Sequence, residues 1–361
     1  MKDIKILTGC VAMLTVIAVG FVLQAAQSVF LPLFIAWIIS YMMAPGVRFL
    51  TRLKVPIGVT TFLLLAVLLY VITVAGSYLS TLIVESSDSI MDYYQRLVAI
   101  WQQFSGRYHI TADYLKGVDW ASALRSTLIA FSGSMVTIIS KAVMVVVFLM
   151  FILIGSPYVE YKMRRAFPQK NAQVMNILDT ISQQIGRFLS VMVLISAATG
   201  LCIWGGLKLV GVDFAVTWGV LAFILNFIPT VGSIVASIPP VLVSLVQFYP
   251  AAQGAAFGIP PQVFMTIAVV LIVQVTIGNI ITPKVMGDSM NLSPVIILLS
   301  LLFWGWLWGV AGALLSMPIA AMIKIVCDNV RQLNMVGVLM GSGQSYKKEF
   351  EAEKQNSTAS V

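Results

Sequence analysis

The longest charge-free stretch of this chain constrains its fold more than any other feature. Residues 214–283 form a run of 70 positions without Asp, Glu, Lys, Arg or His. Because one helical bilayer crossing takes about 20 apolar residues, this run has room for roughly three crossings. Its prolines, glycines and amides indicate that the crossings are interrupted. Interrupted backbone persists at membrane depth only where it is buried in protein or lines a polar cavity.

The composition also indicates an integral membrane protein. Of the 361 residues, 59% are hydrophobic and 10% are charged, and the mean hydropathy is +0.96. Further charge-free runs, most of them long enough for one or two helices, are residues 6–47, 55–84, 142–159, 188–207 and 289–323. We therefore predict an all-α integral membrane protein with about eight transmembrane helices, including Pro/Gly-broken helical hairpins, and a small helical extracytoplasmic insert.

The basic residues lie mainly in short loops between the apolar runs. This pattern orients a membrane protein, so the formal net charge of +8 does not indicate a nucleic-acid partner. With the N-terminus inside, sixteen Lys and Arg residues fall on the inner side and five on the outer side. Lys141 lies early in a span and is expected to extend to the outer surface. We therefore predict a multi-pass protein with both termini cytoplasmic.

The first apolar stretch, residues 6–23, follows Lys2 and Lys5 and has some features of a secretory signal. It is long for a signal, and a second apolar run begins at Ser28. We therefore interpret it as a retained helix.

Five regions follow from the spacing of apolar and polar segments. They are a three-helix N-terminal membrane unit (1–83), an extracytoplasmic helical insert (84–130), a fourth span with a basic amphipathic cytoplasmic linker (131–188), a broken-helix transport unit (189–330) and a mostly disordered cytoplasmic tail (331–361). The insert has apolar residues at helical spacing and is expected to pack on the outer mouth or on a neighbouring subunit; ligand binding is the alternative. The helical part of the linker is expected to lie in the plane of the lipid headgroups.

The first broken-helix motif is the sequence NFIPTVGS, which begins at Asn226. Pro229 removes a backbone donor and disfavours helix just before it, Gly232 allows a turn, and Ser233 can cap the next helix. We expect residues 214–248 to form a hairpin with both ends outside and its tip inside the membrane or just beyond it. Freed backbone groups and polar side chains would meet at this tip, as half-helix ends do in transporter sites.

The second motif covers residues 278–294. Ser293 followed by Pro294 predicts an N-cap and the first position of a new helix. Residues 293–323 are too long for one ordinary span, so we predict a second hairpin with a glycine-broken aromatic corner at Gly305. The pattern Asn-x-x-Pro occurs in both motifs and suggests two related broken units.

The two motifs supply the candidate functional residues. The predicted transport path consists of Asn226, Pro229, Thr230, Gly232, Ser233, Gln274, Asn279, Thr282, Asn291 and Ser293. The predicted hinges or helix breaks are Pro239, Pro240, Gly278, Pro283, Gly287, Pro294 and Gly305. Candidates for ion or proton coupling are Asp288, Lys284 and Asp213. The alternative interpretation is that Pro and Gly are simply common in membrane helices and that the tryptophans form an interfacial belt.

Enzyme signatures are absent from the sequence. There is no GxxxxGK[ST] run and no HExxH, and the single histidine, His109, falls in the predicted insert. Asp288 has no second carboxylate beside it that would form an aspartyl dyad. The three cysteines show no metal-ligand spacing. We predict a protein that is not an enzyme and that uses neither a cofactor nor a metal.

Three segments carry a resemblance to a known family: NFIPTVGSIVASIPP, GNIITPKVMGDSMNLSPVIILLSLLFWGWLWGVAGALLSMPIAAMIKI and FLPLFIAWIISYMMAPGVRFL. They resemble the autoinducer-2 exporter family of bacterial inner-membrane transporters, and the match covers essentially the whole chain. The resemblance implies a bacterial inner-membrane location and a homo-oligomer, a pentamer, in which each protomer carries a transport path. Some relatives in the family are described as sodium/proton antiporters.

The residues themselves favour one of these two functions. Sodium/proton exchange normally needs a carboxylate inside the membrane, and here the nearest candidates, Asp213 and Asp288, lie at the rims. The amides and hydroxyls of the two motifs suit a small uncharged solute. Our hypothesis is export of autoinducer-2, or a similar polar metabolite, by alternating access of the broken-helix unit against the N-terminal unit. A sodium/proton antiporter and a non-transporting scaffold stay open as alternatives. The expected partners are the solute, membrane lipid and further copies of the chain.

Overall fold

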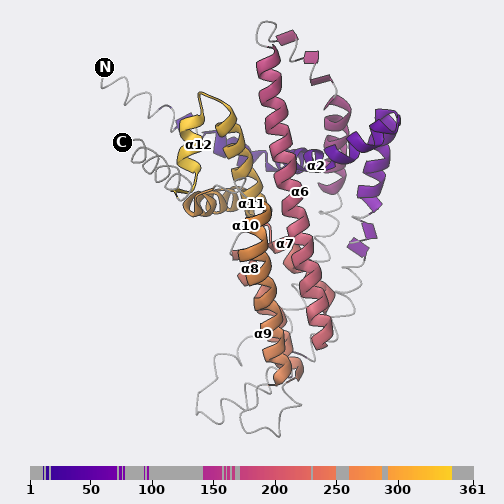
Figure 1. The fold of residues 1–361 in the computed structure, drawn as a ribbon, viewed down its shortest axis with the longest axis vertical. Coiled ribbons are helices and arrows are strands. Elements are labelled where there is room, and N and C mark those ends of the chain that lie inside the picture. Colours follow the sequence, from indigo (N-terminus) through magenta and orange to yellow (C-terminus); the bar gives the residue numbers. More distant parts are fainter. Residues whose placement is uncertain are drawn as a thin grey trace, which may run out of the picture.

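The structure is a computed structural model (Figure 1). The residues that it describes are 11, 14–15, 18–70, 73–74, 76–77, 93, 96, 141–156, 158–159, 161–162, 165–166, 171–228, 231–248, 260–286 and 292–343. These residues form helices and short connections and contain no strand, which confirms the all-α class. Apart from Tyr93 and Arg96, the predicted insert lies outside the described residues, as does the tail beyond 343.

The labelled elements follow one another in this order: α2 (Gln27–Arg52), α6 (Asn171–Val210), α7 (Ala215–Leu225), α8 (Val231–Phe248), α9 (Pro261–Val273), the π-helix η2 (Gln274–Ile281), α10 (Thr282–Met286), α11 (Pro294–Asn329) and α12 (Asn334–Met340). Five helical stretches in the described residues are long and apolar enough to cross a membrane: Gln27–Ala44, Met175–Val210, Val231–Phe248, Pro261–Val285 and Pro294–Asn329. Shorter apolar helices are Ile57–Tyr70, Lys141–Ser156 and Ala215–Leu225. The predicted total of about eight spans stays a prediction.

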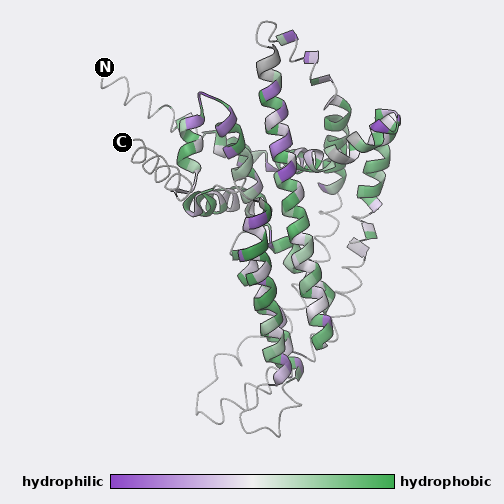
Figure 2. Cartoon of the chain, in the orientation of Figure 1, coloured by the Kyte–Doolittle hydropathy of each residue, from purple (hydrophilic) through white to green (hydrophobic). Residues whose placement is uncertain are grey.

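Helix α6 is the longest straight element of the molecule (Figure 1). Its 40 residues extend about 60 Å, roughly twice the thickness of the hydrocarbon core of a bilayer. Its first half carries many hydrophilic residues and its second half is hydrophobic (Figure 2). Here the structure differs from the prediction of a separate linker helix, because the described linker residues from Asn171 onward continue into the next apolar stretch as one helix. The predicted region boundary at residue 188 therefore falls inside one helix.

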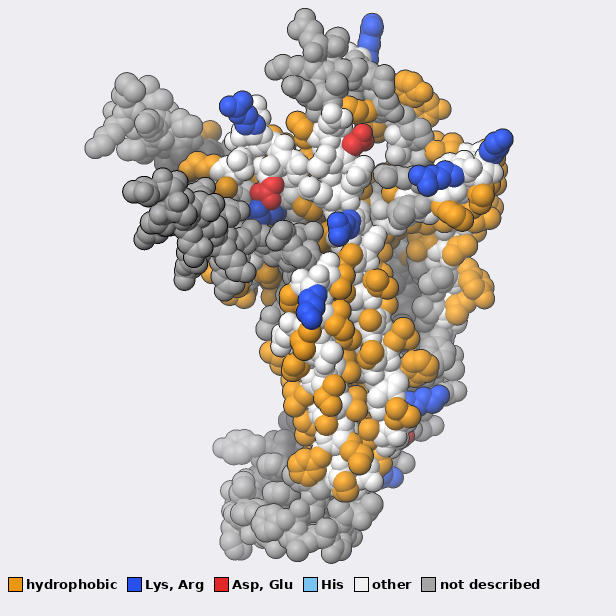
Figure 3. Space-filling view, in the orientation of Figure 1, with side chains coloured by type: hydrophobic (Ala, Val, Ile, Leu, Met, Phe, Trp, Pro, Cys, Tyr) orange, Lys and Arg blue, Asp and Glu red, His pale blue; other side chains and the backbone are white. Residues whose placement is uncertain are grey.

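The basic side chains on the visible face gather mostly near the end of the molecule where α6 begins (Figure 3). The opposite part of this face is covered largely by hydrophobic side chains. This separation is the pattern expected of a protein whose basic end faces the cytoplasm.

Two hydrophobic cores share helix α6. The first core joins α2, the first half of α6 and α11, and contains the fully buried Phe188 and Leu189 together with Trp308. The second core joins the second half of α6 to α7, α8 and α9, and contains Leu207 and Ala236. Helix α11 thus packs with α2 in the first core, and Val273 of α9 lies against both cores. The predicted grouping of residues 189–330 as one unit stays a prediction.

Helices α7 and α8 form a hairpin, as the first motif predicts. Gln247, near the end of α8, donates from Nε2 to the backbone oxygen of Gly211 (2.9 Å) and accepts at Oε1 from the backbone N–H of Asp213 (2.9 Å). The end of α8 therefore lies beside the loop that precedes α7. The predicted break at Pro239 and Pro240 is wrong, because α8 continues through both residues. Membrane helices accommodate proline where neighbouring groups satisfy the freed backbone.

We expect Gln247→Ala to lower the free energy of unfolding by about 1–2 kcal/mol, because it removes two hydrogen bonds that close the base of this hairpin. Thermal unfolding of the purified protein measures the effect. Gln183→Ala changes an exposed glutamine on α6 and is the matched control. Equal melting temperatures for the two variants would show that Gln247 does not hold the hairpin.

Helix α11 is also a hairpin, and its reversal lies at Trp308 and Gly309. Gly309 has φ 62° and ψ −143°, a conformation that glycine adopts without the steric cost paid by other residues. The hydroxyl of Ser300 donates to the backbone oxygen of Ser316 at 2.8 Å, although a separation of 16 residues would be about 24 Å in a straight helix. The second hairpin is thus confirmed, but the predicted break at Gly305 is wrong, because this residue stays helical.

Aromatic residues hold the tip of the α11 hairpin on α2. The Trp308 indole N–H donates to the backbone oxygen of Leu23 (3.3 Å). Its ring lies 5.5 Å from that of Phe34 and 4.9 Å from that of Trp304. Aromatic pairs at these separations contribute stabilisation beyond the area that they bury. The aromatic corner of the sequence therefore serves as a contact between α11 and α2.

The chain from α9 to α10 stays helical but widens into a π-helix over Gln274–Ile281. The predicted breaks at Gly278 and Pro283 therefore do not interrupt the helix. The Thr282 hydroxyl donates to the oxygen of Ile277 (2.7 Å), next to the position where Pro283 cannot donate. π-helical turns are rare and occur frequently at functional sites.

Candidate transport site

The tip of the α7–α8 hairpin is joined to the middle of α6 by two polar side chains. Asn226, the residue after α7, donates from Nδ2 to the hydroxyl of Ser196 on α6 at 3.0 Å. Ser196 is fully buried and Asn226 is partly buried. One turn along α6, Thr199 is 1% exposed and its hydroxyl donates to the oxygen of Ile195 (2.9 Å). We call Asn226, Ser196 and Thr199 the tip site.

Small residues allow α7 to approach α6 closely enough for this contact. A Cβ placed on Gly200 would lie 2.7 Å from the backbone oxygen of Gly219 on α7. Close backbone approach at small residues is typical of helix pairs in membranes. The α6–α7 contact therefore positions Asn226 over Ser196.

The tip site lies deep along α6 and between the two cores. Ser196 is about four helical turns, or about 21 Å, from the end of α6 at Val210, compared with about 30 Å for a whole hydrocarbon core. Ile195 belongs to the first core and Ile203 to the second. A solute bound at this depth would lie at the boundary between the first and the second core.

The tip site offers neutral hydrogen-bonding groups. After its bond to Ser196, the Asn226 amide keeps one N–H and its oxygen, and the Ser196 hydroxyl keeps a proton to donate. A second buried neutral pair lies between α8 and α9, where the Thr266 hydroxyl donates to that of Ser244 at 3.0 Å. These pairs suit the hydroxyl groups of an uncharged solute better than a cation.

Of the remaining residues of the first motif, the structure describes Gly232 and Ser233. Pro229 and Thr230 lie outside the described residues. Gly232 is buried where the first turn of α8 meets the end of α7. Ser233 does not cap α8, because the helix already begins at Val231; its backbone oxygen accepts the Ser237 hydroxyl at 2.6 Å.

The residues of the second motif are not joined to the tip site by any hydrogen bond within the described part of the chain. Gln274 is partly buried at the start of the π-helix, whereas Asn279 is exposed. Helix α11 begins at Pro294 as predicted, but the Ser293 side chain makes no capping bond. Gly287, Asp288 and Asn291 lie outside the described residues.

Two of the three predicted coupling residues can be placed. Lys284 is exposed on α10. Asp213 lies between α6 and α7, where its carboxylate accepts the Tyr93 hydroxyl and its backbone oxygen accepts the Trp218 indole N–H at 3.0 Å. Burial and the bond to Asp213 hold the pKa of Tyr93 above its ordinary value of 10.0. Asp213 thus connects the insert to the base of the hairpin.

Sequence reasoning missed the α6 side of the tip site. Ser196 and Thr199 stand in an apolar stretch without a breaker or a charge nearby, so only the folded contact with Asn226 distinguishes them. It also missed an ion pair on α11 between the buried Lys324 and the partly exposed Asp328, because the sequence places both residues near the predicted inner side.

A long helix with two helical hairpins, one of which brings a polar tip to the middle of that helix, defines a multi-pass α-helical membrane protein built like a secondary transporter. A family model described as "AI-2E family transporter" matches residues 11–332. The chain belongs to this family of transporters, as the resemblance indicated.

Two relatives show how far the similarity extends. A protein of Borreliella burgdorferi named "Putative transport protein" is 32% identical over 326 residues, which are 89% of this chain and 87% of the relative. The AI-2 transport protein TqsA of Escherichia coli is 28% identical over 338 residues, which are 91% of this chain and 93% of TqsA. The similarity thus runs along nearly the full length of both relatives.

Proposed function

We propose that this protein exports a small polar metabolite, the quorum-sensing signal autoinducer-2, across the bacterial inner membrane by alternating access. The observation that carries the proposal is the Asn226–Ser196 pair at the tip of the α7–α8 hairpin. It supplies neutral donors and acceptors deep along α6. An uncharged, hydroxyl-rich solute can replace its hydrogen bonds to water by bonds to these groups. The name of TqsA, an AI-2 transport protein, supports the choice of solute. The proposal includes cytoplasmic termini and a homo-oligomer of five chains.

The two cores suggest which parts move. In this mechanism the second core, with α7, α8 and α9, shifts against the first core, which keeps α11 on α2. Helix α6 runs through both cores. Between the cores, the Thr199 hydroxyl donates a hydrogen bond to the backbone oxygen of Ile195. Such back-bonding often bends helices. In this proposal α11 stays with α2, whereas the sequence placed it in the unit that moves.

A sodium/proton antiporter finds less support among the described carboxylates. Asp213 is engaged by Tyr93, and Asp328 is neutralised by Lys324. A cation would have to displace the Lys324 ammonium before it could bind Asp328. Asp288 is the remaining predicted candidate, and the experiment below includes it.

Purified protein in liposomes should move labelled autoinducer-2, and Asn226→Ala should slow transport about 10- to 100-fold, because the solute loses a polar partner in a buried site. Ser196→Ala should give a similar loss, and the double variant should lose less than the sum of the two effects, because both residues act in one pair.

Asn176→Ala, which changes an exposed amide on α6, is the control and should transport normally. Normal transport by a folded Asn226→Ala protein would contradict the proposed site. A sodium-driven pH change that Asp288→Asn abolishes would instead establish the antiporter, and an inactive wild-type protein would favour the scaffold.

A further inference from the structure

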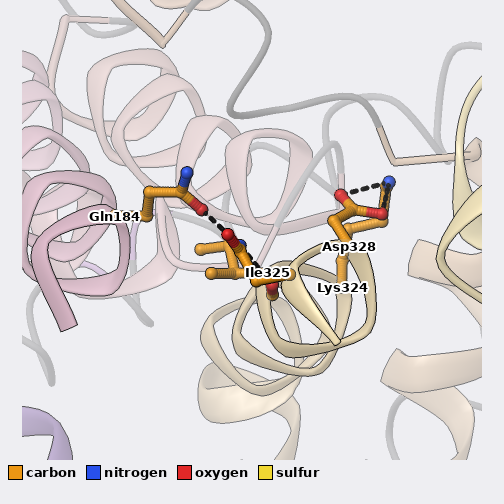
Figure 4. Close-up of polar contacts among 5 residues, drawn as sticks. Gln184, Lys324, Ile325 and Asp328 are labelled. Carbon is orange, nitrogen blue, oxygen red and sulfur yellow. Dashed lines mark hydrogen bonds and ion pairs between the residues drawn. The ribbon is translucent and has the colours of Figure 1, made fainter. Parts of the chain in front are cut away.

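The described part of α11 contains a lysine that is almost completely buried. Lys324 is 7% exposed and lies among the buried residues Ala320, Ala321 and Ile325 of the same helix. Its Nζ donates to both carboxylate oxygens of Asp328, at 2.7 Å and 2.6 Å, one helical turn further along (Figure 4). The Asp328 side chain is 42% exposed. One member of the pair is therefore buried and the other reaches solvent.

This pair lies where helix α12 packs against the end of α11. A Cβ placed on Gly337 of α12 would be 2.3 Å from Oδ1 of Asp328 and 3.2 Å from its backbone nitrogen. At the other end of α12, the backbone oxygen of Met340 accepts the N–H of Ser293 at 2.9 Å. Helix α12 thus touches both the beginning and the end of α11, which are the two open ends of the α11 hairpin.

The same point of α11 is joined to α6. Asn329, the residue after Asp328, donates from Nδ2 to Oε1 of Gln184 at 2.9 Å. Gln184 lies on the side of α11 opposite the Lys324–Asp328 pair (Figure 4). Ile181 and Ile185 of α6 pack in the core that also contains Ile325. The same core contains Met340, the last residue of the seven-residue α12, so α12 is held by this core at one end and lies against Asp328 at Gly337.

We propose that Lys324 and Asp328 form a latch that holds α12 across the open ends of the α11 hairpin, so that α12 detaches as a unit when the pair separates. The latch is stabilised by the free-energy cost of leaving the buried ammonium of Lys324 without its counter-charge. When Asp328 is lost, Lys324 must reach water, and it can do so by displacing α12. When Lys324 is lost, Asp328 is already exposed enough to stay hydrated. The inference does not depend on which solute the protein carries.

Hydrogen exchange of the full-length protein tests the latch, because it measures the opening of residues 334–340 directly. In the wild-type protein these amides should be protected. Asp328→Asn should speed their exchange about 100-fold, which corresponds to about 3 kcal/mol at 1.4 kcal/mol per tenfold change. Lys324→Met should change exchange by less than about threefold, because methionine fills the apolar space and leaves no buried charge. The double variant should behave like Lys324→Met.

Helix α8, in the second core, is the internal control and should exchange at the wild-type rate in every variant. An Asp328→Asn protein in which α8 and α12 exchange faster together would show that the pair supports the whole fold, and would overturn the latch. Equal effects of Asp328→Asn and Lys324→Met would overturn it as well, since only the first leaves a buried charge. Unprotected α12 amides in the wild-type protein would show that α12 is not held at all.

Discussion

Gly232→Ala is expected to abolish transport by a protein that still inserts into the membrane. A Cβ on Gly232 would lie 1.8 Å from the backbone oxygen of Leu225 and 2.7 Å from its carbonyl carbon. Both atoms belong to the last turn of α7, so no flexible side chain can move aside. The hairpin would have to open at its tip, and Asn226, which follows Leu225 directly, would be pulled away from Ser196.

We expect this change to cost about 3 kcal/mol of stability, because overpacking against backbone is relieved only by shifting a helix. The rate of autoinducer-2 transport in liposomes should fall at least as far as in Asn226→Ala. Gly278→Ala is the matched control, since nothing lies within 4 Å of a Cβ at that position in the π-helix. If Gly232→Ala retained wild-type transport and melting temperature, the close approach of α7 and α8 at the tip would be wrong.

The local breaks of the chain could be predicted from the sequence where a single residue type decides the backbone. Proline at 294 marks the beginning of α11, because its missing donor and fixed φ suit the first position of a helix. The lengths of the apolar runs predicted two hairpins, and the structure contains both. These features depend on local covalent geometry, which the sequence specifies directly.

Features that depend on packing could not be predicted in the same way. The aromatic corner contains Gly305 and Gly309, and either could allow a reversal. The structure reverses at Gly309, next to Trp308, whose ring packs against Phe34 of α2. The prolines at 239 and 240 looked like a break but lie within α8. Likewise, Ser196 becomes part of a site only because α7 folds back along α6. Each outcome depends on contacts between segments far apart in the sequence.

The α11 hairpin depends on a second close approach, at Gly312. A Cβ there would lie 1.8 Å from the backbone oxygen of Trp304 and 3.0 Å from the Cβ of Trp308. The two halves of α11 therefore meet backbone to backbone just beyond the reversal at Gly309. The same contact holds Trp304 and Trp308 in position against Phe34 of α2.

Gly312→Ala should therefore destabilise the protein by about 3 kcal/mol or more, since it forces the halves of α11 apart and withdraws Trp308 from the first core. Thermal unfolding and the yield of folded protein in the membrane measure this loss. Gly305→Ala is the matched control, because its Cβ would meet only the Cβ of Ala313 at an ordinary 3.8 Å. A larger effect at Gly305 than at Gly312 would place the reversal at Gly305 after all, and the aromatic contact between α11 and α2 would have to be rebuilt around it.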